Sequence, residues 1–167
     1  MHGCQRGGRL REARLDRFDF SAYAGFPVTL ADVPGLRCDR CGYATPTGKA
    51  ISAATVQVAL RILKQPARLR GVHARYLRKL LEVSQGDLAA RMGTHRTTVN
   101  RWENETAPIS KENDFILRTL AAFHLMEEGS VGLADLLGDG ALAAVRSRAP
   151  AKRPPRLVIE RLLARRG

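Results

Sequence analysis

Apolar positions recur at helical spacing in several stretches from Lys49 onward. The first stretch ends at Gln65-Pro66, and the residues of one face lie four, three and four positions apart: Ile51, Thr55, Val58 and Ile62. A second begins after Gly71 with the apolar positions Val72, Tyr76, Leu77, Leu80 and Leu81. The last runs from Ile109 to Met126 and carries Ile116, Leu117, Leu120, Phe123 and Leu125. The pattern predicts a mainly α-helical chain.

Between the second and the last of these helices, the pattern predicts two short helices joined by a sharp turn. Ser84 is followed three positions later by an acidic residue, which is typical of a helix N-terminus. Gly93 supplies the turn, because only glycine adopts a positive φ without steric cost. The next helix runs from about 95 to 103, with Val99 and Trp102 pointing inward. Two helices joined in this way within a bundle form a helix-turn-helix.

The helix at 95–103 offers polar and cationic side chains to its outside. With its apolar residues turned inward, the outward positions are Arg96, Thr97, Asn100 and Arg101. Arginine can contact guanine in a bidentate manner and threonine can meet a thymine methyl, so this face suits the major groove of DNA. Gln85, at the start of the preceding helix, is placed for a phosphate. Composition alone leaves open an ordinary solvated surface helix.

Residues 1–48 differ from the rest because they mix glycine, proline, charges and short β-favouring pieces. Phe26–Leu30 favours a strand, and Pro34-Gly35 predicts a turn before Leu36. So few large apolar residues would struggle to bury a core, and small modules of this kind usually need a metal or a disulfide. The predicted organisation is a β module at 1–48, a linker helix at 49–70, a helix-turn-helix domain at 71–128 and a helical extension with a basic tail at 129–167.

The charge of the chain favours a polyanionic partner. The chain has 167 residues, a net charge of +12 and a pI near 10.8, which make nucleic acid the leading class of partner. Residues 49–70 carry +5 and residues 146–167 carry +7. We expect the tail to be a disordered solubilising segment. A basic arm on DNA phosphates is the functional alternative, and a membrane-surface helix is a weaker one.

Other classes of function are disfavoured. No apolar run approaches the roughly 20 residues needed to cross a bilayer, and the N-terminus lacks the apolar stretch of a secretory signal. Three cysteines cannot form a closed set of disulfides, and the spacing of Cys38 and Cys41 suits metal better. We therefore expect a cytoplasmic protein with no membrane partner. The four histidines have no acidic or nucleophilic partner at the spacing of a known catalytic motif, so we do not expect an enzyme.

The segment LEVSQGDLAARMGTHRTTVNRWENETAPIS resembles the Xre/Cro-type helix-turn-helix family. The positions that match its pattern are Ser84, Gln85, Leu88, Ala89, Gly93, Val99, Arg101, Trp102 and Glu103. The resemblance implies sequence-specific binding of double-stranded DNA, and it places at the DNA interface Gln85, Arg96, Thr97, Thr98 and Arg101. His95 stands where Ser or Thr often caps the recognition helix, so the cap stays open between Thr94 and His95. We include His95 in the expected DNA-binding set.

The N-terminal part is similar to the YgiT-type zinc-finger half of MqsA-type antitoxins. The similarity lies in Cys4–Gly8, Tyr23–Val33 and Leu36–Gly42, and the whole resemblance covers roughly residues 4–126. It implies an Xre/Cro-like bundle preceded by a small β-rich zinc-finger-like module, in a homodimer that represses its own operator and binds a toxin protein. We expect an antitoxin and autorepressor. The alternatives are a stand-alone transcriptional regulator, or mainly a toxin-neutralising module with weak DNA affinity.

The metal site that this resemblance implies is degenerate. Two C-x-x-C pairs would supply the four thiolates of a closed tetrahedral zinc site, but Gly7 replaces the second cysteine of the first pair. The remaining candidate ligands are Cys4, Cys38 and Cys41, with His2 as a possible fourth. Structural zinc and a finger held only by its hairpin, with free thiols, are both open.

Overall fold

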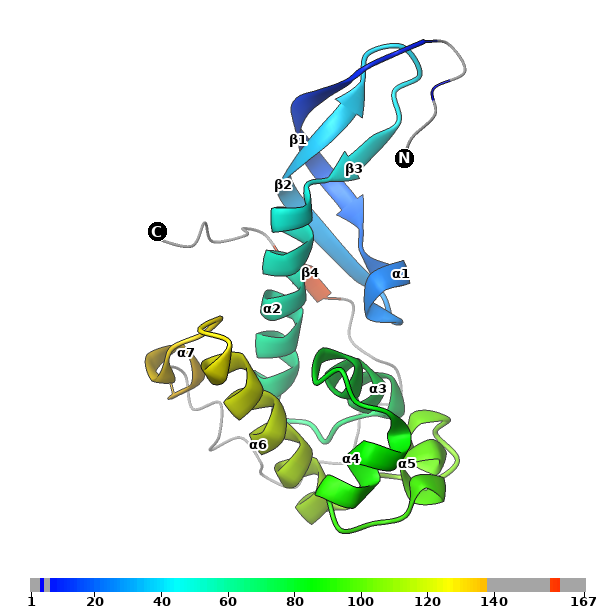
Figure 1. Cartoon of the computed structure of the whole chain (residues 1–167), viewed down its shortest axis with the longest axis vertical. Helices are drawn as coiled ribbons and strands as arrows, with labels where there is room; N and C mark the ends of the chain where they lie inside the picture. The colour runs from blue at the N-terminus through cyan, green and yellow to red at the C-terminus, as the bar shows by residue number, and fades with distance from the viewer. Residues whose placement is uncertain (1–3, 5–6, 138–156, 160–167) are drawn as a thin grey trace. The chain divides into compact units, whose positions relative to one another are not determined.

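The computed structural model describes residues 4, 7–137 and 157–159 (Figure 1). The chain falls into two compact units. Unit 1 comprises residues 1–57 and 156–167, and unit 2 comprises residues 58–155. The boundary falls within the helix α2 (Gly48–Lys64), which is where the sequence predicts a linker helix. The described strands belong to unit 1 and most of the helices to unit 2, so each unit is described by itself.

Unit 1 is built on a long antiparallel hairpin. β1 (Leu10–Asp19) pairs with β2 (Val28–Cys38), and the short helix α1 (Ser21–Ala24) lies in the connection between them. β3 (Ala44–Pro46) pairs antiparallel with β2 at residues 35–37. β4 (Leu157–Ile159) pairs in parallel with β2 at residues 28–30. The central strand of the described sheet is therefore β2.

The inward and outward sides of β2 exchange at Asp32. Val28 and Leu30 are buried before it, whereas Val33 is buried after it, so the two-residue alternation shifts by one position. Asp32 has a φ of +52°, in the left-handed region that aspartate tolerates better than most residues. The guanidinium of Arg14 on β1 holds this conformation, because it donates to the Asp32 carboxylate and, at 2.9 Å, to its backbone carbonyl.

The turn expected at Pro34-Gly35 is wrong, because both residues lie inside β2 and pair with β1. A Cβ at Gly35 would lie 2.7 Å from the Leu15 side chain, so this glycine permits close packing rather than a turn. Pro34 has no N–H to give to a sheet, and its carbonyl accepts from the N–H of Thr47 at 3.1 Å. The sequence pattern also missed β1, in which six of ten residues are charged.

Unit 2 is a bundle of helices. The short helices α3 (Gly71–Leu80), α4 (Gln85–Arg91) and α5 (Arg96–Glu103) precede the longer α6 (Lys111–Glu127) and the short α7 (Leu133–Leu137). The helices expected near 95–103 and 109–126 are thus present within two residues of the predicted bounds. Core side chains that are at most 3% exposed include Val58, Ile62, Leu77, Leu88, Val99, Trp102, Leu117 and Leu125.

A buried ion pair ties the end of α2 to α6. Arg118 and Asp114 lie one turn apart on α6, are 3% and 1% exposed, and share a hydrogen bond of 3.0 Å between Nε and Oδ1. The guanidinium also donates to the carbonyls of Ile62 and Leu63 at 2.7 and 2.8 Å. Carbonyls in the last turn of a helix have no partner within the helix, and a cation there is favoured by the helix dipole. The guanidinium of Arg118 therefore caps the C-terminus of α2.

Two further expectations change with the structure. Ile116 and Phe123, counted among the apolar positions of the last helix, are 36% and 59% exposed, because the buried face of α6 is formed by other positions that include Leu117 and Leu125. Residues 157–159, expected in a disordered tail, form β4 because they pair with β2. The rest of the expectation for the tail, at 138–156 and 160–167, lies outside the described residues. Within the described part of the chain, no helix has the length and apolar character that crossing a membrane requires.

Candidate nucleic-acid interface and thiol cluster

The connection between α4 and α5 sets the direction of α5. Gly93 has a φ of +64°, and the N–H groups of Gly93 and Thr94 donate to carbonyls of α4 at 3.3 and 2.9 Å. The chain then enters α5 through His95, an extended N-cap residue whose side chain makes no capping hydrogen bond. The cap that the sequence left open between Thr94 and His95 is therefore His95. The predicted glycine turn is confirmed.

α4 begins at a reciprocal capping box. Oγ of Ser84 accepts from the N–H of Asp87 at 3.1 Å, and Oδ2 of Asp87 accepts from the N–H and the Oγ of Ser84 at 3.1 and 2.6 Å. The hydrogen bonds from Ser84 lower the pKa of Asp87 below its ordinary value. The N-terminus predicted at Ser84 is confirmed, and the box fixes the position of Gln85, the first residue of α4.

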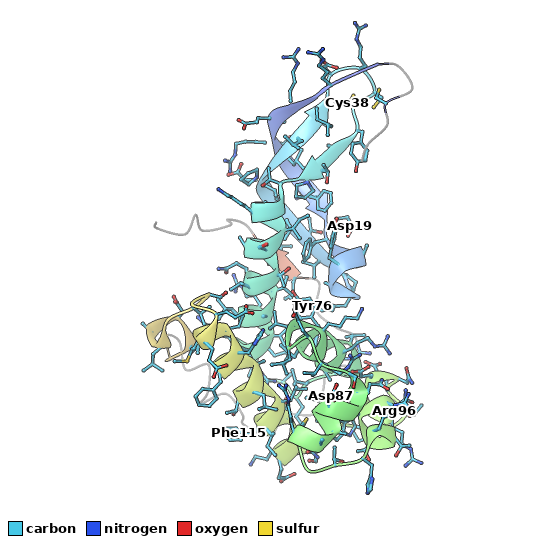
Figure 2. All side chains as sticks on the ribbon, viewed as in Figure 1. Asp19, Cys38, Tyr76, Asp87, Arg96 and Phe115 are labelled. Atoms are coloured by element: carbon cyan, nitrogen blue, oxygen red, sulfur yellow. The ribbon has the colours of Figure 1, made fainter. Side chains whose placement is uncertain are left out.

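The two faces of α5 differ sharply. Val99 and Trp102 are 1% and 3% exposed, so they anchor the helix in the bundle. The exposed side chains among the expected DNA-binding residues are His95, Arg96, Thr97, Asn100 and Arg101, while Thr98 is half-buried. Figure 2 shows Arg96 on the outer side of α5. The outer face therefore presents the donors that base contacts need, and the contact of each residue with DNA stays a prediction.

A buried carboxylate, Glu103, holds the last turn of α5. It is 4% exposed, and Nε of Arg78 donates to its Oε1 at 2.6 Å, while Nη2 of Arg78 and Nε2 of Gln85 donate to Oε2 at 3.1 and 2.9 Å. Nε of Arg75 lies 3.5 Å from the same oxygen. Burial by itself raises the pKa of Glu103, but these hydrogen bonds and charges outweigh burial and the pKa lies below its ordinary value. The ionised carboxylate thus joins α3, α4 and α5.

Sequence reasoning matched Glu103 to a family pattern but missed this structural role. Its partners Arg78 and Arg75 lie 25 and 28 residues earlier in the sequence, beyond any local pattern. One signal was available: Glu103 lies four residues after Val99, so a helix that buries Val99 also turns Glu103 inward. A buried carboxylate needs charged partners, and the basic residues of α3 were among the candidates.

Gln85 was expected at a phosphate, but its amide is engaged within the protein. Its Nε2 donates to Glu103, and its Oε1 accepts from Nδ2 of Asn100 at 3.4 Å. Oδ1 of Asn100 accepts in turn from Nδ2 of Asn104 at 3.1 Å. This chain of amides orients Asn100 on the outer face of α5. Gln85 therefore positions a neighbour on the candidate interface.

Exposed arginines outnumber exposed carboxylates on α4 and α5, where the exposed acidic residue is Asp87. Arg91 at the end of α4 and both Arg96 and Arg101 of α5 are exposed. The acidic residue of α5 is Glu103, which is buried against two arginines and so contributes little negative potential to the surface. Clustered exposed cations attract phosphate groups and steer association with nucleic acid.

Three cysteines gather at the end of the β1–β2 hairpin. The Sγ atoms of Cys4, Cys38 and Cys41 all lie within 4.8 Å of one another, and Figure 2 shows sulfur atoms beside Cys38. Gly42 has a φ of +73°, and its N–H donates to the carbonyl of Cys38 at 3.1 Å, which brings Cys38 and Cys41 together. Gly7 has a φ of +66° and donates to the carbonyl of Cys4 at 3.0 Å. Gly7, which replaces the second cysteine of the first pair, is thus hydrogen-bonded to Cys4.

The backbone around the thiols packs tightly against Cys38. A Cβ at Gly8 would lie 2.5 Å from Sγ of Cys38, so the backbone approaches the sulfur directly. Asp39 accepts from the N–H of Arg9 at 3.0 Å and from Nε of Arg11 at 3.2 Å, and these hydrogen bonds lower its pKa. Three thiolates at this spacing could bind a soft metal ion. His2, the proposed fourth ligand, lies outside the described residues.

Comparison with known families matches residues 75–113 to the helix-turn-helix family. The match covers most of α3, all of α4 and α5, and the start of α6. No curated protein and no solved structure gives a match. Residues 75–113 are therefore a helix-turn-helix domain of the Xre type. The presence of this domain supports the interpretation of the protein as a DNA-binding transcription regulator. The matched residues do not extend into unit 1.

Proposed function

We propose that the protein is a sequence-specific transcriptional repressor that inserts α5 into the major groove of its operator. The observation that carries the proposal is the division of α5 between a buried face, at Val99 and Trp102, and an exposed face suited to bases and phosphates. A helix anchored by buried side chains presents its outer residues in one fixed geometry, and base discrimination needs that geometry.

The exposed residues of α5 contact different chemical groups of the DNA. Arg96 and Arg101 contact guanine, and each good bidentate contact contributes about 1–3 kcal/mol of discrimination. Thr97, one turn before Arg101, meets a thymine methyl. Asn100, oriented by Gln85, suits adenine, which asparagine contacts through two hydrogen bonds. His95 and Thr98 complete the interface at the start of the helix, where backbone N–H groups favour a phosphate.

The experiment is a binding titration of the full-length protein against the duplex upstream of its own gene and a scrambled duplex of the same length. At two salt concentrations, we expect preference for the upstream duplex to persist while both affinities fall, because released counterions affect all duplexes alike. Equal and equally salt-dependent affinity for both duplexes would leave only non-specific charge binding, and the repressor proposal would fail.

The repressor acts as a homodimer and as the antitoxin of a toxin–antitoxin pair, with unit 1 binding the toxin. What supports this is the sequence resemblance of residues 4–126 to MqsA-type antitoxins, together with the gathering of the three cysteines at one end of a hairpin. The test is to inspect the gene neighbourhood for a small adjacent reading frame and to co-express the protein with any such frame, since the absence of one would favour the stand-alone regulator. Relief of growth arrest supports the pair, and an adjacent frame that is harmless alone favours the stand-alone regulator.

The three cysteines hold a structural zinc ion. The chemistry of the donor set supports this, because thiolates are preferred zinc ligands and Gly8 leaves room for the sulfur of Cys38. Bound zinc would fix the N-terminal segment to the β1–β2 hairpin. A metal analysis of protein purified without added zinc tests it, with Cys38→Ser as the control, since one zinc per chain is expected in the parent and none in the variant.

A further inference from the structure

β4 adds a strand from late in the sequence to the first part of β2 (Figure 1, drawn in red). Its three residues pair in parallel with Val28–Leu30, and the N–H of Leu157 donates to the carbonyl of Pro27 at 3.3 Å. β1 pairs with the other side of the same residues, and β3 pairs with β2 farther along, at residues 35–37. Removal of β4 would expose backbone groups at this edge of β2, and such an edge pairs readily with another strand.

The side chains of β4 alternate between the core and solvent. Ile159 is 3% exposed, Leu157 is half-buried and Val158 is 48% exposed. The neighbouring side chains of Val28 and Leu30 on β2 are almost completely buried. Strand addition of this kind takes its affinity from backbone hydrogen bonds and its specificity from alternate side chains. This edge therefore fits an extended segment with aliphatic residues at the first and third positions.

The favourable and unfavourable contributions to the free energy of β4 docking are similar in size. Its three residues pair only with β2, whereas β1 pairs with β2 along nearly its whole length. Ordering the three residues costs backbone conformational entropy. The opposing gain comes mainly from burial of Ile159, with a smaller part from the half-buried Leu157. A strand held in this way can leave the sheet without unfolding the β1–β2 hairpin.

We propose that the edge of β2 at Val28–Leu30 is a docking site for an extended aliphatic segment, and that residues 157–159 of the same chain occupy it as a detachable strand. When the strand detaches, the site is open to an added peptide with the sequence of this strand. This docking does not depend on the proposed repressor function, because none of these residues lies within the helix-turn-helix domain at 75–113.

The test compares two full-length variants that introduce the same charge, Ile159→Asp and Val158→Asp. An aspartate at 159 would have to be buried for β4 to dock, whereas one at 158 would remain in solvent. The probe is a fluorescent peptide with the sequence of residues 154–162. We expect it to bind the Ile159→Asp protein at least roughly tenfold more tightly than the parent or Val158→Asp, because in those proteins the tethered strand competes for the site at high effective concentration.

Hydrogen exchange of the same three proteins supplies the second measurement. We expect Ile159→Asp to speed exchange at residues 28–30 and 157–159 while protection in the rest of β1 and β2 persists. Loss of protection throughout the hairpin would make β4 an integral part of the core and overturn the proposal. The milder Ile159→Ala should give an intermediate peptide affinity.

Two other outcomes would also overturn the proposal. Equal peptide binding by all three proteins would mean that the edge of β2 does not select the segment. A molecular mass that falls only in Ile159→Asp, measured by light scattering, would mean that β4 is exchanged between two copies of the chain rather than docked within one.

Discussion

Unit 2 should lose stability in mild acid because of one buried histidine, His73. This side chain is 2% exposed, and its Nδ1 lies 3.0 Å from Nε2 of Gln65 and accepts from the N–H of Arg70 at 3.4 Å. Burial, followed by the positive charges of Arg70 and Arg118, lowers the pKa of His73 from 6.5 to about 4. The folded protein therefore keeps His73 neutral at a pH where the unfolded chain protonates it.

Proton linkage gives the sign and the size of the pH effect on the free energy of unfolding. Between pH 6.5 and about 4 the unfolded chain binds more protons at this residue, so the free energy of unfolding falls as the pH falls. The contribution is fully present above pH 6.5. A shift of one pKa unit corresponds to about 1.36 kcal/mol, so the loss between pH 7.5 and pH 5 is about 2 kcal/mol.

The assay is urea denaturation at pH 7.5 and pH 5 for the parent and for His73→Asn. The asparagine Oδ1 can replace Nδ1 as the acceptor for Gln65 and Arg70, but it does not titrate. We expect the variant to lose about 2 kcal/mol less than the parent over this pH interval, whatever its stability at pH 7.5. His124→Asn, on α6, controls for removal of a histidine. An unchanged pH dependence in His73→Asn would refute the reasoning.

Three further predictions concern the bundle and the thiols. A Cβ at Gly71 would lie 2.1 Å from a backbone carbonyl oxygen of α5, so Gly71→Ala should lower the free energy of unfolding by about 1–3 kcal/mol. A Cβ at Gly86 would meet nothing nearer than 3.6 Å, so Gly86→Ala should raise the free energy of unfolding by up to about 1 kcal/mol. Urea denaturation measures both changes. Glu103→Gln should cost about 3 kcal/mol in the same assay, because it leaves the largely buried guanidinium of Arg78, whose side chain is 15% exposed, without its counter-ion, and a loss below about 1 kcal/mol would contradict that account. Removing metal with a chelator should increase proteolysis of unit 1 in the parent but not in Cys38→Ser, and equal sensitivity in both would argue against a bound metal.

The parts of the fold that follow from local spacing could be predicted from the sequence. The capping box at Ser84, the turn at Gly93 and the inward pair Val99 and Trp102 depend on residues within four positions of one another. Each such signal identifies a helix end or a helix face without knowledge of the rest of the chain. For this reason the amino-acid sequence alone is sufficient to predict the helix-turn-helix.

The parts that depend on distant residues could not be predicted in this way. Pro34-Gly35 was predicted as a turn because proline followed by glycine is typical of turns. In the structure β2 runs through both residues, and Asp32, which has a positive φ, is in contact with Arg14 of β1. No local sequence pattern indicates this contact. β4 joins β2 from more than a hundred residues away, and its three residues are too few to show a period.

The candidate site divides in the same manner. The outward positions of α5 follow from helical periodicity once its buried face is known. The engagement of Gln85 with Glu103 does not, because it depends on how α4 packs against α5. The expected phosphate contact of Gln85 was an inference from its place at a helix start, and the structure adds a positioning role that the place alone could not reveal.

The central claim is that α5 carries sequence-specific recognition of DNA. The most direct measurement is the ratio of affinities for the upstream and scrambled duplexes in Arg101→Ala, beside the parent and Arg61→Ala, which removes an exposed cation from α2. We predict that Arg101→Ala lowers this ratio by roughly 5- to 150-fold, equivalent to about 1–3 kcal/mol, while Arg61→Ala leaves it unchanged. A ratio that stays the same in Arg101→Ala, or that falls equally in both variants, would contradict the account.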